Sequence, residues 1–216
     1  TNPLHIVAPN GRDRIAAFPA NGADTPMQIA LSSAPVKNKD IPHNLAAMTA
    51  ALAQAAADGA DLVVFGESTL QGFDCLCWSY AADRDMALPL DSAPIRQLQD
   101  AAQKYATAIS FGFTERDGDA LYSSCAFISA DGEIIHRFRR VSIGWKDYRA
   151  DEWNSAIKHE YAEQAQKCGR RVLLINPYCA DENAADAAAG GAVDFRDGKI
   201  QAELPAGNSG MLMINV

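Results

Sequence analysis

A short apolar run that ends in glycine and glutamate, DLVVFGESTLQGF at residues 61–73, most constrains the fold of this chain. Its four consecutive apolar residues include two valines and predict a buried strand at residues 62–65. Gly66 ends the strand, and Glu67 stands where the strand emerges. Open α/β sheets place their chemistry at the carboxyl ends of strands, so Glu67 is a candidate catalytic residue. The alternative is a solvated loop glutamate, because isolated glutamates are mostly exposed.

Helix-like and strand-like segments alternate around this strand. Asn44 can cap a helix that Gly59 ends, and Asp91 or Ser92 can cap a second helix. A third helix is expected at residues 153–168. Strands are expected at residues 27–31, 108–114, 121–129, 134–140, 171–175, 192–195, 199–204 and 211–216. Helices and strands that alternate early, with hairpins late, predict a mixed-sheet α/β layered fold.

Length and charge narrow the function classes. A chain of 216 residues supports one sizeable core, so we expect one domain at residues 27–216 after an N-terminal arm at residues 1–26. The net charge of -8 disfavours a nucleic-acid or anionic-membrane partner. No apolar run approaches the length of a membrane helix, and no secretion signal opens the chain. We therefore expect a cytoplasmic protein.

The cysteines give no disulfide or metal pattern. They are odd in number and irregularly spaced, and the one close pair has C-x-C spacing, which does not match a zinc knuckle. Reduced cytosolic thiols are the favoured interpretation. The five cysteines are Cys75, Cys77, Cys125, Cys168 and Cys179.

Taken together, these segments resemble the carbon–nitrogen hydrolase family, the nitrilase and amidase superfamily. The resemblance covers nearly all of residues 27–216. It is carried by the helix, strand and glutamate of residues 44–73, by LYSSCAFISADGEIIHRFRR at 121–140, by EYAEQAQKCGRRVLLIN at 160–176 and by residues 190–216. It implies an α-β-β-α sandwich that usually dimerises. It also implies no cofactor and the hydrolysis of a small-molecule amide or nitrile.

The resemblance assigns roles to individual residues. The family uses a Glu as general base, a Cys thiolate that attacks the substrate carbon to give a thioester, and a Lys that stabilises the oxyanion. Glu67 matches the Glu. The family's Lys falls on Arg140, and Lys146 is an alternative. An arginine can stabilise an oxyanion but cannot share a proton at neutral pH. Both cations could instead be solvated surface charges.

No cysteine occupies the place of the family nucleophile. The family carries it on a strand in the interval that here spans only residues 147–153. Either the chain is a non-catalytic binding or scaffold member of the fold, or a stretch is missing between Tyr148 and Ser155. We favour the second, because loss of a central strand would open sheet edges. A missing stretch predicts a Cα separation there well above the usual ~3.8 Å.

The loop at residues 74–80 follows the glutamate segment and contains two large aromatic residues. Trp78 and Tyr80 are predicted to form apolar walls of a substrate pocket. The alternative is that they anchor a surface loop. The sequence does not identify the substrate.

Overall fold

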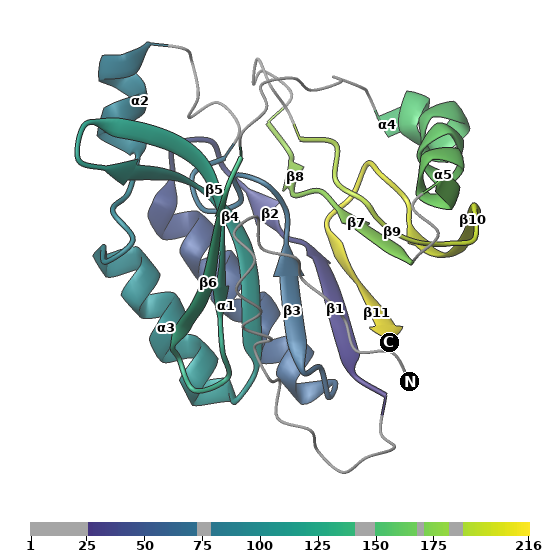
Figure 1. Cartoon of the computed structure of the whole chain (residues 1–216), viewed down its shortest axis with the longest axis horizontal. Helices are drawn as coiled ribbons and strands as arrows, with labels where there is room; N and C mark the ends of the chain where they lie inside the picture. Colours follow the sequence, from purple (N-terminus) through teal and green to yellow (C-terminus); the bar gives the residue numbers. More distant parts are fainter. Residues whose placement is uncertain (1–25, 73–78, 141–149, 168–170, 182–187) are drawn as a thin grey trace.

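Two stacked β-sheets lie between layers of helices in the computed structural model (Figure 1). Helices α1 (Ile41–Ala57) and α3 (Ala93–Tyr105) pack on the outer face of the larger sheet, and α5 (Lys158–Lys167) packs on the smaller sheet. This layering confirms the predicted α-β-β-α sandwich. No helix among the described residues is long and apolar enough to cross a membrane. The structure describes residues 26–72, 79–140, 150–167, 171–181 and 188–216.

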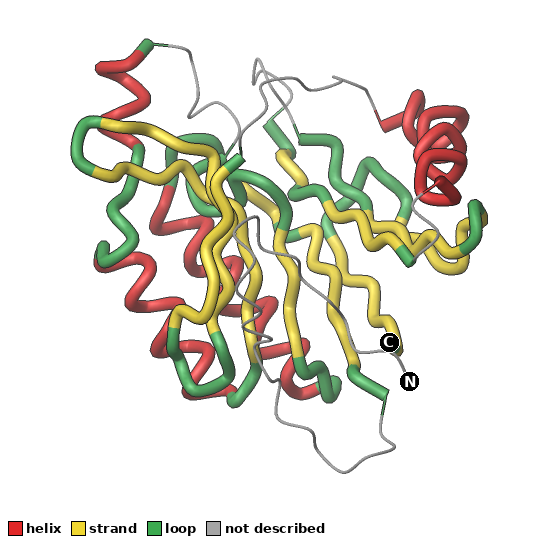
Figure 2. Tube along the Cα trace, viewed as in Figure 1, coloured by secondary structure: helices red, strands yellow, loops and turns green. Residues whose placement is uncertain are grey.

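The larger sheet has six strands of mixed direction, in the order β11-β1-β3-β4-β5-β6, and Figure 2 draws all strands in yellow. Strands β1, β3 and β4 are parallel, and β11, β5 and β6 run antiparallel to their neighbours. The strands are β1 (Gln28–Ser33), β3 (Leu62–Phe65), β4 (Ala108–Asp117), β5 (Ala120–Ile128), β6 (Ile134–Arg139) and β11 (Gly210–Asn215).

The smaller sheet has the order β10-β9-β7, and a separate two-stranded parallel pair joins β2 to β8. Apolar side chains of the two sheets, among them Leu31, Leu62 and Ala192, meet between them. These strands are β7 (Val172–Ile175), β9 (Ala192–Arg196), β10 (Lys199–Leu204), β2 (Pro35–Val36) and β8 (Tyr178–Cys179).

The start of α1 differs from the sequence prediction. The prediction that Asn44 caps this helix is wrong, because the Asp40 side chain accepts a hydrogen bond from His43 N at 3.0 Å and Pro42 occupies the first turn. Asn44 is buried one turn in, where its side chain bonds both N and O of Lys37. For α3, Ser92 is the N-cap, as predicted. Helix α2 (Tyr80–Met86) was not predicted.

The third predicted helix is continuous but irregular. It consists of α4 (Ala150–Glu152), a π-helical turn η2 (Trp153–Ile157) and α5. In the π turn, Asn154 donates to Ala206 O at 2.9 Å and accepts from Ala206 N at 3.0 Å. Of the window in which a break was predicted, residues 148–155, the structure describes only the part from Ala150 on. The backbone of that part is continuous. A missing stretch before Ala150 stays a prediction.

Side-chain alternation along β4 and β5 decides which polar groups meet. Ile109, Phe111 and Phe113 of β4 face the helices. Residues between them, such as Gly112, therefore face the other side of the sheet. On β5, Ala126 packs against the helices, so Ser124 shares the helix-facing side and Ser123 the opposite one. We call these the helix face and the inner face.

Candidate active site

Glu67 lies in the turn after β3, and two glycines allow this turn to fit. A Cβ on Gly112 would lie 2.6 Å from Glu67 Cα, and a Cβ on Gly66 would lie 2.4 Å from Pro177 Cδ. Gly112 N also donates to Gly66 O at 3.1 Å. The turn is therefore held between β4 and the residues that follow β7, at a separation that only glycine permits.

Hydrogen bonds from the turn's own side chains hold it further. Thr69 Oγ1 donates to Gly66 O at 2.7 Å. Gln71 donates from Nε2 to Thr114 O at 2.9 Å and accepts from Thr114 N at 3.0 Å. Ser68 has a positive φ of 53°. Gln71 thus fixes the turn that carries Glu67 to β4, and Thr69 closes the turn on itself.

Glu67, Arg140 and Ser123 meet on the inner face. Arg140 Nη1 and Ser123 Oγ each donate to Glu67 Oε1 at 2.9 Å. Arg140 N also donates to Ser123 O at 2.8 Å. The side chain of Glu67 is 37% exposed and that of Arg140 26% exposed, so solvent can reach the pair. The structure therefore brings together two of the predicted site residues and adds Ser123.

Comparisons with known proteins give the family of the chain. The family model described as "Carbon-nitrogen hydrolase" matches residues 28–213. The chain belongs to the carbon–nitrogen hydrolase family. In fold, it is similar to a solved amidase of the nitrilase superfamily from Nesterenkonia AN1, with a TM-score of 0.67, 15% identity and coverage of 90% of this chain and 92% of that one.

Curated relatives match a shorter part of this carbon–nitrogen hydrolase. An arylacetonitrilase of Hypocrea virens is 36% identical over 94 residues, which cover 40% of this chain and 29% of that protein. An aliphatic nitrilase of Rhodococcus rhodochrous is 33% identical over 42% of this chain and 27% of its own length. A citrullinase of Francisella tularensis is 34% identical over 49% and 37%, respectively. The chain thus spans about a third of the length of these relatives.

The other predicted site residues do not join the Glu67 group in the described structure. Lys146 and Trp78 lie outside the described residues. Tyr80 begins α2, is 54% exposed, and donates its hydroxyl to Asp119 O at 2.7 Å in the β4–β5 turn. The predicted roles of Tyr80 and Trp78 in substrate binding, and of Lys146 in stabilising the oxyanion, stay predictions.

The two described cysteines lack the features of a hydrolase nucleophile. Cys125 lies on the inner face opposite Gly112, with Sγ 3.4 Å from Ser110 Oγ. Burial raises the pKa of the Cys125 thiol, so the thiol is protonated at neutral pH. Cys179 is buried in β8. The other three cysteines lie outside the described residues.

A second carboxylate–arginine–serine group occupies the helix face of the same strands. Glu115, only 1% exposed, accepts from Ser124 Oγ at 2.6 Å and from Arg137 Nη1 at 2.7 Å. Arg139 donates to both Glu115 oxygens, at 2.7 and 3.0 Å, and to Asp117 at 2.6 Å. These bonds engage both oxygens of Glu115, which indicates a structural role. No pattern in the sequence predicted this group.

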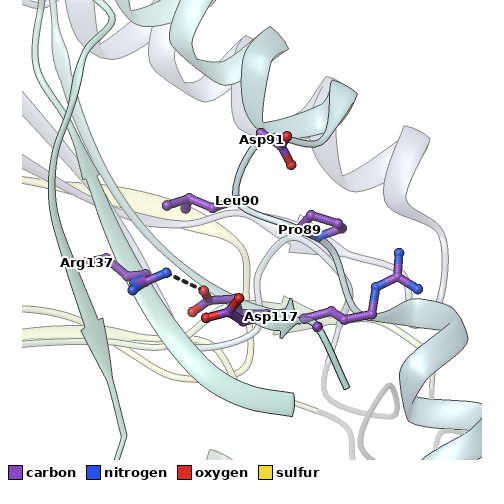
Figure 3. Close-up of a pocket in the computed structure, with 8 residues that line it drawn as sticks. Pro89, Leu90, Asp91, Asp117 and Arg137 are labelled. Atoms are coloured by element: carbon purple, nitrogen blue, oxygen red, sulfur yellow. Dashed lines mark hydrogen bonds and ion pairs between the residues drawn. The ribbon is translucent and has the colours of Figure 1, made fainter. Parts of the chain in front are cut away.

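An open pocket of about 400 Å³ borders the Glu115 group, away from Glu67 (Figure 3). Pro89, Leu90 and Asp91 lie on one side of it, and Asp117 and Arg137 on the other. The dashed line in the figure joins Arg137 to Glu115. Three of its charged lining residues are already engaged in ion pairs: Glu115 pairs with Arg137 and Arg139, and Asp117 pairs with Arg139.

The Glu115 group predicts an acid-sensitive fold. Burial acts to raise the pKa of Glu115, but hydrogen bonds from Arg139 and Ser124 and the charges of both arginines outweigh it and leave the pKa below the ordinary 4.5. A lowered folded-state pKa means that the stabilisation is present above that ordinary value and is lost as pH falls below it. Urea unfolding between pH 7 and 3 should show this loss. Glu115→Gln should have a flatter profile, and equal slopes for the two proteins would contradict the prediction.

The close approach at Gly112 gives a prediction for the turn. Gly112→Ala should destabilise the protein by about 1–3 kcal/mol, because its Cβ meets backbone atoms of Glu67 and Ser68 that cannot move independently. Gly210→Ala is the matched control, since that strand glycine also lacks a positive φ but its Cβ would meet only the flexible Leu204 side chain. Urea unfolding midpoints measure both. Equal midpoints would show that the turn is not held as described.

Proposed function

We propose that this protein hydrolyses a carbon–nitrogen bond of a small-molecule nitrile or amide, with Glu67 as general base and proton shuttle. The observation that carries the proposal is the Glu67 carboxylate, fixed at the carboxyl end of a parallel strand beside the Arg140 guanidinium. The similarity to nitrilases and a citrullinase supports this substrate class. The resemblance further implies a homodimer, which light scattering tests, and the sequence itself predicts a cytoplasmic location.

For an amide, the proposed chemistry proceeds through a thioester. Glu67 takes the proton of a cysteine thiol, and the thiolate forms a C–S bond to the carbonyl carbon. Arg140 supplies fixed positive charge for the oxyanion that develops. Glu67 then gives the proton to the leaving nitrogen, and ammonia departs as the C–N bond breaks. Water, deprotonated by Glu67, attacks the thioester, which releases a carboxylic acid and restores the thiol.

The arginine at the family's lysine position shapes this mechanism. A guanidinium remains charged at neutral pH, so Arg140 can donate hydrogen bonds and offer positive charge but cannot relay a proton. Every proton transfer in the proposed cycle therefore passes through Glu67. Lys146 would be a second cation for the same oxyanion.

The nucleophile itself would come from a cysteine-bearing strand in a missing stretch, which would lie before Ala150 because the backbone is continuous from Ala150 on. We place that strand along β7, which within the described residues pairs only with β9. Each residue of β7 is partly exposed, although all four are apolar. Pro177, just after β7, packs against Gly66. A strand beside β7 would thus end near Glu67.

A second candidate function is ligand binding without turnover. It is favoured by the raised pKa of the Cys125 thiol, the burial of Cys179 and the arginine in place of lysine. In that case, the Glu67–Arg140 pair binds a polar ligand, and no covalent intermediate forms.

Ammonia release and thiol labelling separate the two candidates. The protein is incubated with phenylacetonitrile, a short aliphatic nitrile and propionamide, and then with iodoacetamide followed by peptide mass spectrometry. Ammonia release, together with one rapidly labelled cysteine that a substrate protects, supports the hydrolase. No ammonia from any of the three probes and no rapidly labelled thiol would reject it in favour of the binding protein.

A further inference from the structure

Ser123 contacts both members of the Glu67–Arg140 pair through separate groups. Its hydroxyl donates to Glu67 Oε1, and its carbonyl accepts from the backbone N of Arg140. Ser123 therefore links the turn after β3 to the end of β6. Removing the hydroxyl alone would leave the backbone link in place.

The two carboxylate groups differ in how their oxygens are used. Both oxygens of Glu115 accept hydrogen bonds, and its side chain is almost fully buried. At Glu67, Ser123 and Arg140 both bind Oε1, and no described residue donates to Oε2. Two donors on one oxygen fix the rotation of the carboxylate and direct the other oxygen to a separate position.

We propose that Ser123 is a positioning residue, which holds Glu67 by Oε1 so that Oε2 is the atom that accepts the thiol or water proton. Arg140 alone is a weaker constraint, because a long, partly exposed side chain can hold the carboxylate in several geometries. The short serine side chain on a paired strand has far fewer conformations. The role of Oε2 as proton acceptor rests on the proposed function, whereas the contact between Ser123 and Glu67 does not.

The kinetic test compares two neighbouring serines on opposite faces of β5. Ser123→Ala should lower kcat for the probe that is turned over best by about 10–100-fold with KM nearly unchanged, because a base displaced by ~1 Å loses such factors. Ser123→Thr, which restores a hydroxyl, should recover most of kcat. Ser124→Ala, which removes a hydrogen bond to Glu115 instead, should leave kcat within about twofold. An unchanged kcat in Ser123→Ala, or no rescue by threonine, would overturn the proposal.

A double-mutant cycle tests the contact without any activity. Ser123→Ala, Glu67→Ala and the double variant are unfolded in urea, and the unfolding equilibrium constants should show a coupling of about 3–10-fold. Ser124→Ala with Glu67→Ala should be additive. Absence of coupling would overturn the positioning role even if Glu67 proved essential for turnover. Coupling in a protein that hydrolyses no probe would support the hold on Glu67 and reject the hydrolase proposal alone.

Discussion

Glu67→Gln should lower ammonia release from nitrile and amide probes by at least about a thousandfold, because glutamine has the shape of glutamate but cannot accept the thiol proton. The amide can still accept hydrogen bonds from Ser123 and Arg140 through its oxygen. The substitution therefore removes the base with little change in the contacts around it. Initial rates at saturating probe concentration give the comparison.

Glu133→Gln is the control for this variant. Glu133 is exposed in the turn between β5 and β6, so the substitution makes the same change of charge away from the inner face. Its rate should equal that of the unmodified protein. Turnover by Glu67→Gln at the control rate would refute the assignment of Glu67 as the base.

Glu115→Ala should lower the free energy of unfolding by about 3 kcal/mol, at the lower end of what breaking a buried ion pair costs. The variant leaves Arg137 and Arg139 with their main partner removed. Both arginines are partly exposed, so water recovers some of this loss. Urea unfolding at pH 7 measures the change.

Asp117→Ala is the control for Glu115→Ala, because it removes an exposed carboxylate that pairs with the same arginine, Arg139. Asp117 also pairs with Arg139 at 2.6 Å, but its side chain is largely exposed, so its loss should be much smaller. In the folded state, Glu115→Ala should retain kcat, because Glu115 lies on the face opposite Glu67. A loss of kcat equal to that of Glu67→Gln would show that the two faces do not act separately.

Several features of the fold follow from local sequence. The apolar run at residues 62–65, the glycine after it and the alternation of segments were sufficient to predict β3, the place of Glu67 and the layered fold. The start of α3 was predicted at Asp91 or Ser92, and Ser92 is the observed N-cap. In these cases a short pattern and the structure it forms involve the same few residues.

Features that depend on distant contacts were not predicted. Ser123 meets Glu67 across 56 residues, and Arg137 meets Glu115 only through the pairing of β5 with β6. That pairing includes an irregularity between Phe127 and Ile128, which no sequence pattern indicates. The start of α1 was missed because Asp40 caps the helix, while the Asn44 side chain is used one turn in, partly by a bond to Leu70 O across 26 residues.

The buried Glu115 group also disfavours incorrect register between β5 and β6, the two strands that carry Ser123 and lead to Arg140. A slip of β6 by one residue in one direction would place Phe138 where Arg139 now meets Glu115, and the opposite slip would place Phe138 where Arg137 does. Either error leaves a buried carboxylate short of a cation, which is costly. Correct pairing, enforced on the helix face, is what delivers Arg140 to Glu67 on the inner face.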